Sequence, residues 1–191
     1  MKYEVQIFED VPFEPKPGEY KCEVLNRSGT VVIISINDKG EPTQERYGLV
    51  DRKEVYSLIE AGQIINLNFC YIAGFSLDEY RKKRSMNKGT NVLIKLYQAR
   101  NTFFDTGKSF ENAIGYKLYS SKSMSGYNDV SFNRAHFVDG DVDFGGAKFG
   151  NAKVDFYRVN FGNGRVNFKG TQFGDGKVVF KEAKFADGTV K

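Results

Sequence analysis

The last third of the chain places one hydrophobic residue type at a fixed period. Phenylalanines occur there at steps that alternate between five and seven residues, so the repeat is twelve residues long. The series consists of Phe132, Phe137, Phe144, Phe149, Phe156, Phe161, Phe168, Phe173, Phe180 and Phe185. A fixed period of this kind predicts a solenoid or an array of stacked repeats.

A small residue stands two positions before each of these phenylalanines. The small residues are Val130, Ala135, Val142, Ala147, Val154, Val159, Val166, Thr171, Val178 and Ala183. Residues i and i−2 of an extended chain point the same way, so each small-x-Phe unit predicts a short strand with two inward side chains. The step from Phe132 to Ala135 is odd, so the chain must turn a corner between units. We therefore expect coils lined by phenylalanine, with successive coils paired as parallel strands about 4.8 Å apart.

Turn dipeptides recur in the longer, seven-residue steps. They are Asp139-Gly140, Asn151-Ala152, Asn163-Gly164, Asp175-Gly176 and Asp187-Gly188. Asn and Asp tolerate the left-handed backbone and Gly adopts it freely. The pattern predicts the same left-handed turn at every second corner.

Several units resemble the repeat of the pentapeptide-repeat family, in which a small residue, often Asp or Asn, and then Leu or Phe precede two variable positions. Val142-Asp143-Phe144 and Val166-Asn167-Phe168 match this repeat directly, and Ala147-Lys148-Phe149 matches it at the inward positions. The resemblance implies a right-handed, four-sided β-helix with one unit on each side. Every second unit here is two residues longer, so a coil would hold about 24 residues rather than about 20.

Two other arrangements are compatible with the period. One is a narrower coil of twelve residues, in which two phenylalanines per turn would be crowded. The other is an antiparallel meander with the dipeptides as hairpin turns, which would need a bulge in every strand. We favour the wider coil over both.

Upstream, residues 1–62 are predicted to form a β-rich cap with one short helix. Tyr3, Val5 and Ile7 alternate with polar residues, as on a half-buried strand. Other predicted elements are strand-like segments at 20–25 and 30–36, a turn at 37–40, and a helix over 52–61 that begins with the capping-box pair Asp51 and Glu54.

Residues 63–129 are predicted to be an irregular, helix-interrupted start of the solenoid. Ile65-Asn66-Leu67 and Cys70-Tyr71-Ile72 are five-residue units, and Ser76 with Glu79 forms a second capping box before a helix over 78–86. The Ser-, Gly- and Tyr-rich segment 116–129 is predicted to be a loop. The predicted fold class is mainly β: a right-handed parallel β-solenoid, regular over 130–191, with an N-terminal β/α capping region.

Composition and charge limit the function classes. The 191 residues are 40% hydrophobic and 27% charged, as expected of a folded soluble protein. The net charge of +4 is far from the strong basic field that dominates duplex binding, and it differs from the strongly acidic pentapeptide-repeat proteins that shield DNA gyrase. The sequence shows no membrane-spanning stretch and no signal-peptide core, so we expect a cytoplasmic protein without membrane contact. Cys22 and Cys70 are expected to be isolated thiols.

The chain offers little for catalysis, so we expect no enzyme, no cofactor and no metal. His136 is the only histidine, and its slot beside Phe137 predicts an outward surface position. The segment 106–109 ends like a phosphate-binding loop, but Thr102 stands where that motif needs glycine.

Cationic clusters supply the candidate binding residues. They are the basic run Arg81, Lys82, Lys83 and Arg84, and the corner residues Lys153, Arg165 and Lys177. On a helix the basic run would be a positive patch that could meet phosphate or an acidic partner. In a 24-residue coil Lys153 and Lys177 would stack on one edge, with Arg165 on the opposite edge.

Three function classes follow from these observations. We favour a non-catalytic scaffold, in which a rigid rod presents outward residues to a protein partner. The alternatives are a nucleic-acid- or topoisomerase-linked binding protein, and the N-terminal targeting or regulatory part of a longer enzyme or effector. An open strand edge at the last coil also predicts a homodimer through the C-terminal coil, unless the chain continues beyond it.

Overall fold

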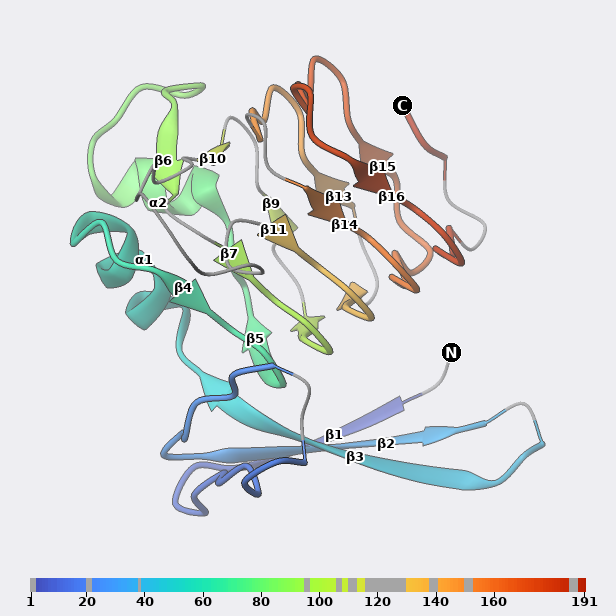
Figure 1. Cartoon of the computed structure of the whole chain (residues 1–191). Coiled ribbons are helices and arrows are strands. Elements are labelled where there is room, and N and C mark those ends of the chain that lie inside the picture. Colours follow the sequence, from blue (N-terminus) through green and yellow to red (C-terminus); the bar gives the residue numbers. More distant parts are fainter. Residues whose placement is uncertain are drawn as a thin grey trace.

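The computed structural model describes residues 3–19, 22–37, 39–94, 97–105, 108–109, 113–115, 130–137, 141–149, 153–185 and 189–191. The protein is mainly β, as predicted, and contains parallel sheets and stacked aromatic rings. Figure 1 shows three N-terminal strands along one side, helices α1 and α2 at one end, and a succession of short strands that leads to the C-terminus. The predicted loop over 116–129 lies outside the described residues.

An antiparallel sheet forms the N-terminal part. Its strands are β1 (Tyr3–Phe8), β2 (Thr30–Ile36) and β3 (Pro42–Val50). The predicted turn joins β2 to β3, where Asn37 Oδ1 accepts hydrogen bonds from the backbone N–H groups of Lys39 and Glu41, each at 2.9 Å. The side chain of Asn37 thus closes the hairpin by pairing with its own turn.

The strand predicted over 20–25 is wrong for the part that the structure describes. Residues 22–25 contain no strand. The carbonyl oxygen of Glu23 accepts instead from Asn68 Nδ2 at 2.8 Å and from Asn66 Nδ2 at 3.4 Å. Side-chain amides therefore take the place of a strand ladder in this segment.

Strand β3 connects the antiparallel sheet to the parallel sheets. Residues Pro42–Gly48 of β3 pair antiparallel with β2. The last residues of β3, Gly48–Val50, pair in parallel with Cys70–Ile72 of β5. One strand thereby belongs to a long hairpin and to the first parallel pair at once.

Both predicted helices are present. Helix α1 (Arg52–Glu60) begins after Asp51, whose carboxylate accepts from the backbone N–H of Lys53 at 2.9 Å. The partner in the predicted capping box, Glu54, binds Arg27 instead, at 2.6 Å. Helix α2 (Leu77–Lys83) begins after Ser76 and ends before the predicted residue 86, because Ser85 has a left-handed φ of 54°.

Short parallel strands make up the rest, and we call them the array. They are β4 (Ile65–Asn66), β5 (Cys70–Ala73), β6 (Val92–Ile94), β7 (Tyr97–Gln98), β8 (Phe103–Asp105), β9 (Lys108–Ser109), β10 (Ala113–Gly115), β11 (Val130–Ser131), β12 (His136–Phe137), β13 (Val142–Asp143), β14 (Val154–Asp155), β15 (Val166–Asn167) and β16 (Val178–Val179). The sheets run in the orders β1-β2-β3-β5-β8-β12, β16-β14-β11-β7-β4, β15-β13-β9 and β10-β6. Strands β4 and β5 come from the predicted five-residue units, so parallel pairing starts well before the regular repeat.

The pairing of strands in the array shows how many residues separate one layer from the next. Val130 pairs in parallel with Val154 and Val154 with Val178, so each step is 24 residues. Val142 pairs with Val166 at the same step. The twelve-residue coil and the antiparallel meander are therefore wrong for the described residues. We call each 24-residue segment a layer.

Phenylalanine rings stack from layer to layer inside the array. The centroids of Phe132 and Phe156 are 5.2 Å apart, and those of Phe156 and Phe180 are 4.8 Å apart, with interplanar angles of 5° and 9°. Such nearly parallel rings at this spacing bury large apolar surfaces against one another. The predicted inward direction of the small-x-Phe units is confirmed, since Val154, Phe156 and the corresponding residues of the preceding layer are buried.

The turns within the longer steps lie where they were predicted, but the left-handed residue lies elsewhere. Positive φ occurs at Gly162 (65°) and Gly174 (59°), each directly before a predicted dipeptide. The first glycine of the Gly-Asn-Gly and Gly-Asp-Gly triplets therefore supplies the backbone freedom. The dipeptides at 139–140, 151–152 and 187–188 lie outside the described residues.

Candidate binding groove

The predicted basic run does not form one open patch. Arg81 is only 1% exposed, and its guanidinium donates to the carbonyl of Thr90 at 2.7 Å and to Asp78 at 2.9 Å. Arg84 pairs with Glu60, and the ammonium of Lys83 lies 5.6 Å from the ring centroid of Tyr56. Two of the four cations thus have carboxylate partners within the fold, and Arg81 holds helix α2 against the segment that follows it.

The two corner lysines stack as the wider coil predicted. The carbonyl of Lys153 accepts from Val130 and that of Lys177 accepts from Val154, so the two lysines occupy equivalent places in successive layers. Arg165 lies in a different column, where two of its guanidinium nitrogens donate to Asp141 at 2.7 and 3.0 Å. This pairing lowers the pKa of Asp141 through the hydrogen bonds from Arg165. Whether these cations bind a partner stays a prediction.

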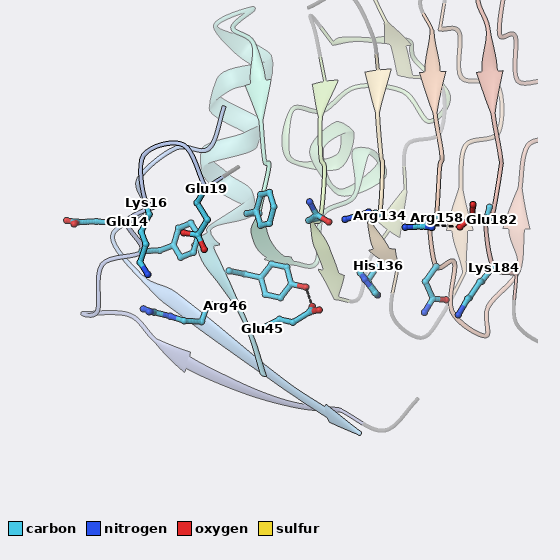
Figure 2. A pocket seen from close by; sticks show the side chains of 16 residues that line it. Glu14, Lys16, Glu19, Glu45, Arg46, Arg134, His136, Arg158, Glu182 and Lys184 are labelled. Carbon is cyan, nitrogen blue, oxygen red and sulfur yellow. Dashed lines mark hydrogen bonds and ion pairs between the residues drawn. The ribbon is translucent and has the colours of Figure 1, made fainter. Parts of the chain in front are cut away.

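A further candidate site lies between the N-terminal hairpin, formed by β2 and β3, and the outer face of the array. It is a groove of about 1100 Å³, shown in Figure 2. Its lining comprises Phe13, Glu14, Lys16, Glu19, Glu45, Arg46, Tyr47, Phe69, Asn101, Arg134, His136, Arg158, Asn160, Glu182, Ala183 and Lys184. The groove exists because β3 pairs with the array only through its last residues, while the rest of the hairpin extends past the array (Figure 1).

One side of the groove is a column of bend residues, which we call the groove column. It consists of Phe69, Asn101, Arg134, Arg158 and Glu182, all non-glycine residues with φ between 49° and 60°. Backbone bonds link the column across layers, for example from the N–H of Arg134 to the carbonyl of Tyr157 at 2.8 Å. Non-glycine residues adopt this backbone at a cost, and such conformations gather at functional sites.

The equivalent bends on another side of the array are glycines. Gly146 and Gly170 have φ of 64° and 70°, and we call this pair the glycine column. Glycine adopts this backbone without strain. The fold therefore tolerates glycine at such a bend, and the groove column carries side chains where glycine would suffice.

His136 does not occupy the open surface position that its outward slot predicted. Its ring is half-buried and stacks on Phe103, with centroids 6.1 Å apart and an interplanar angle of 17°. Phe103 in turn stacks on Tyr71 at 5.8 Å. Burial lowers the pKa of His136, Glu45 acts against this shift, and Lys184 adds to it. The prediction failed because the N-terminal hairpin covers this face of the array.

Charges in the groove are mixed and unevenly paired. The described part of the lining holds five cations (Lys16, Arg46, Arg134, Arg158 and Lys184) and four carboxylates (Glu14, Glu19, Glu45 and Glu182). Arg158 Nε donates to Glu182 at 2.6 Å, which raises the pKa of the guanidinium and lowers that of the carboxyl. Burial raises the pKa of the Tyr47 phenol, and Glu45, which accepts a hydrogen bond from its hydroxyl, raises it further. Figure 2 shows Arg134, Arg158, Glu182, His136 and Lys184 on the array side, with Glu14, Lys16, Glu19 and Arg46 opposite.

The arrangement suits recognition by hydrogen bonds and charge. Among the described residues that line the groove there is no Ser, Thr or Cys, and the Tyr47 hydroxyl is already bound to Glu45. Among the residues that the structure describes, no three His, Cys, Asp or Glu side chains gather so that they could hold a metal ion. Likewise, the helices described are too short and too polar to cross a membrane.

Sequence reasoning missed the groove residues, although one signal was present. Arg134, Arg158 and Glu182 stand directly before the small residue of a unit, at steps of 24 residues, and Gly146 and Gly170 hold the same slot in the alternate units. The alternation of charged residue and glycine distinguishes two faces. No such signal indicated that Glu45 and Arg46 line the groove, because their place in it depends on where the hairpin lies.

Comparison with known proteins gives no match, since no family model fits the chain and neither a curated protein nor a solved structure is similar to it. The resemblance to pentapeptide repeats therefore depends on the residues of the repeat alone.

Proposed function

We propose that this protein is a non-catalytic interaction module in which a stiff β-array holds the groove for a protein partner. The observation that carries the proposal is the groove column. Charged side chains occupy left-handed bends beside a groove, at positions whose counterparts on another side of the array are glycine. Retained strain of this kind is evidence of a role for the side chain.

We further infer that the array is a right-handed solenoid of the pentapeptide-repeat type. The 24-residue parallel register and the inward small-x-Phe units support this inference. A stack of layers that contact only their neighbours gives a stiff platform for binding. An experimental density map with four-sided, right-handed coils would bear out the inference, and any other cross-section would contradict it.

Site-specific photo-crosslinking tests the proposed function. A benzophenone amino acid would replace exposed Glu14 at the groove or exposed Lys169, which is not among the groove residues. In the native cell, the groove position should give a crosslinked protein band that the Lys169 position does not give. The band should weaken when Arg134→Gly is added. Equal crosslinking from both positions, or none from the groove position, would refute the proposal that the groove binds a protein partner.

Pairing of two copies through the last layer is also part of the proposal. Phe180 and Phe185 are only half-buried, and Val190 is 51% exposed. An apolar strand edge of this kind favours association with another edge. Light scattering of the protein should give a dimer mass, and a stable monomer at micromolar concentration would rule out the pairing.

The proposed compartment is the cytoplasm. Cys22 and Cys70 are both free thiols, as expected in a reducing compartment, and burial raises the pKa of Cys70 to about 11. Fractionation of the native cell would test this location.

A further inference from the structure

The array side of the groove carries both paired and unpaired charges. On the array side, Arg158 and Glu182 neutralise one another. Arg134 and Lys184 are exposed and form no ion pair with any described residue. The array side therefore presents two cations that a ligand could neutralise.

The spacing of these two cations matches an extended peptide. Arg134 and Lys184 belong to layers two steps apart, because His136 is bridged to Asn160 and Asn160 to Lys184. Parallel strands lie about 4.8 Å apart, so the two backbone positions are separated by about 10 Å along the array. An extended chain advances about 3.3 Å per residue and covers that distance in about three residues.

The opposite side of the groove disfavours a nucleic acid. Among the described residues, the N-terminal side of the groove carries Glu14 and Glu19 beside Lys16 and Arg46, so its charge is balanced and it offers no continuous row of cations to phosphates (Figure 2). Sequence-tolerant binding of single strands also needs exposed aromatic faces for the bases. Of the described aromatic residues in the lining, Phe13 and Tyr47 are 4% and 3% exposed, and the ring of His136 already stacks on Phe103. Phe69 is half-buried.

Amides on the array side suit a peptide backbone. Asn101 and Asn160 line the groove, and Asn160 Oδ1 already accepts from the N–H of Gly162 at 3.1 Å. The Nδ2 group of Asn160 can then donate to a peptide carbonyl. Peptide groups and separated carboxylates together would satisfy the polar lining better than a polyanion would.

We propose that the groove binds an extended peptide segment of a partner protein, whose acidic side chains contact Arg134 and Lys184. This inference rests on the proposed function and adds the chemistry of the partner. Charge-assisted hydrogen bonds from Arg134 and Lys184 supply the selectivity for carboxylates. The far side presents mixed charge, because Lys16 and Arg46 accompany Glu14 and Glu19, so the acidic side chains of the segment face the array side.

The test is a selection from a random dodecapeptide display library against the full chain. Parallel selections use the double variant Arg134→Gly/Lys184→Gln and the control variant Lys148→Gln. Lys148 holds the same slot in its repeat as Lys184 and is exposed, but it is not a groove residue. Glycine suits the left-handed bend at Arg134, so the double variant should keep the fold, which thermal unfolding checks.

The expected result is enrichment of peptides rich in Asp and Glu on the wild type and on Lys148→Gln. The double variant should lose that enrichment. A synthetic copy of one enriched peptide should bind the double variant about a hundredfold more weakly, since each lost charge contact costs about tenfold. Its affinity should fall as salt rises.

Other outcomes overturn the inference in separable ways. Enrichment of basic or apolar peptides that depends on Arg134 and Lys184 would keep the module and reject the acidic ligand. Groove-dependent binding of a labelled oligo-dT dodecamer that exceeds peptide binding would assign the groove to nucleic acid. Enrichment that is identical on wild type and double variant would reject both the ligand and the groove as a binding site.

Discussion

The groove column and the glycine column share one backbone conformation and differ in their side chains. Arg134 and Arg158 have φ of 55°, and Gly146 and Gly170 have φ of 64° and 70°. The bend therefore needs a left-handed residue on both sides, and only the groove side carries charge. Folding accounts for the bends, and the proposed recognition of a partner would account for the charged residues placed on them.

Removal of a central ring should disrupt both columns together. Phe156 is fully buried and stacks between Phe132 and Phe180, so Phe156→Ala should lower the free energy of unfolding by about 3–5 kcal/mol. Urea denaturation measures this change. Phe185→Ala, at a half-buried ring that stacks on Phe161, is the control and should cost less. Equal losses at the two sites would contradict the role of layer stacking.

Arginine at the glycine column should destabilise the fold through the backbone alone. A Cβ at Gly170 would meet only backbone atoms of Gly146, at 3.9 Å, so Gly170→Arg brings no steric clash. Its φ of 70° should still cost about 1 kcal/mol. Thermal unfolding should show a melting temperature lower by about 2–4 °C. An unchanged melting temperature would mean that the strain at this bend does not exceed the gain from the reduced freedom of the unfolded chain.

The reverse exchange at the groove column should leave stability nearly unchanged. Arg134→Gly relieves a left-handed arginine, and the greater freedom of glycine in the unfolded chain offsets this gain. We expect a free energy of unfolding within about 1 kcal/mol of wild type by urea denaturation. A much larger loss would show that Arg134 holds the fold together, and the comparison of the two columns would fail.

The smallest effect should be a pH dependence from His136. Its folded-state pKa is lower than its unfolded value, so the unfolded chain binds the proton more readily. The contribution of His136 to the free energy of unfolding is therefore present above about pH 6.5 and declines as the pH falls below that value. His136→Gln should flatten the stability profile between pH 7 and 5, measured by denaturation at each pH. An unchanged slope would mean that the pKa of His136 is the same in the folded and the unfolded chain.

The sequence predicted the local features of the array because those features depend on neighbouring residues. Two inward positions per unit follow from strand geometry, and the odd step from Phe132 to Ala135 requires a bend. The caps at Asp51 and Ser76 also follow from local hydrogen bonding, and both helices begin after them. Even so, Glu54, the expected capping-box partner of Asp51, forms an ion pair with Arg27, which is distant in sequence.

The sequence by itself determined that phenylalanines line a repeat and that bends separate its units, because period and parity are properties of the local chain. Only the tertiary structure decided that the layer has 24 residues, since the choice between 12 and 24 depends on which distant strands pair. It also decided that Arg81 is buried and that His136 lies under a hairpin. The groove formed in the same way, because residues from β3 and from successive parts of the array meet only when the long-range pairing of β3 with β5 is made.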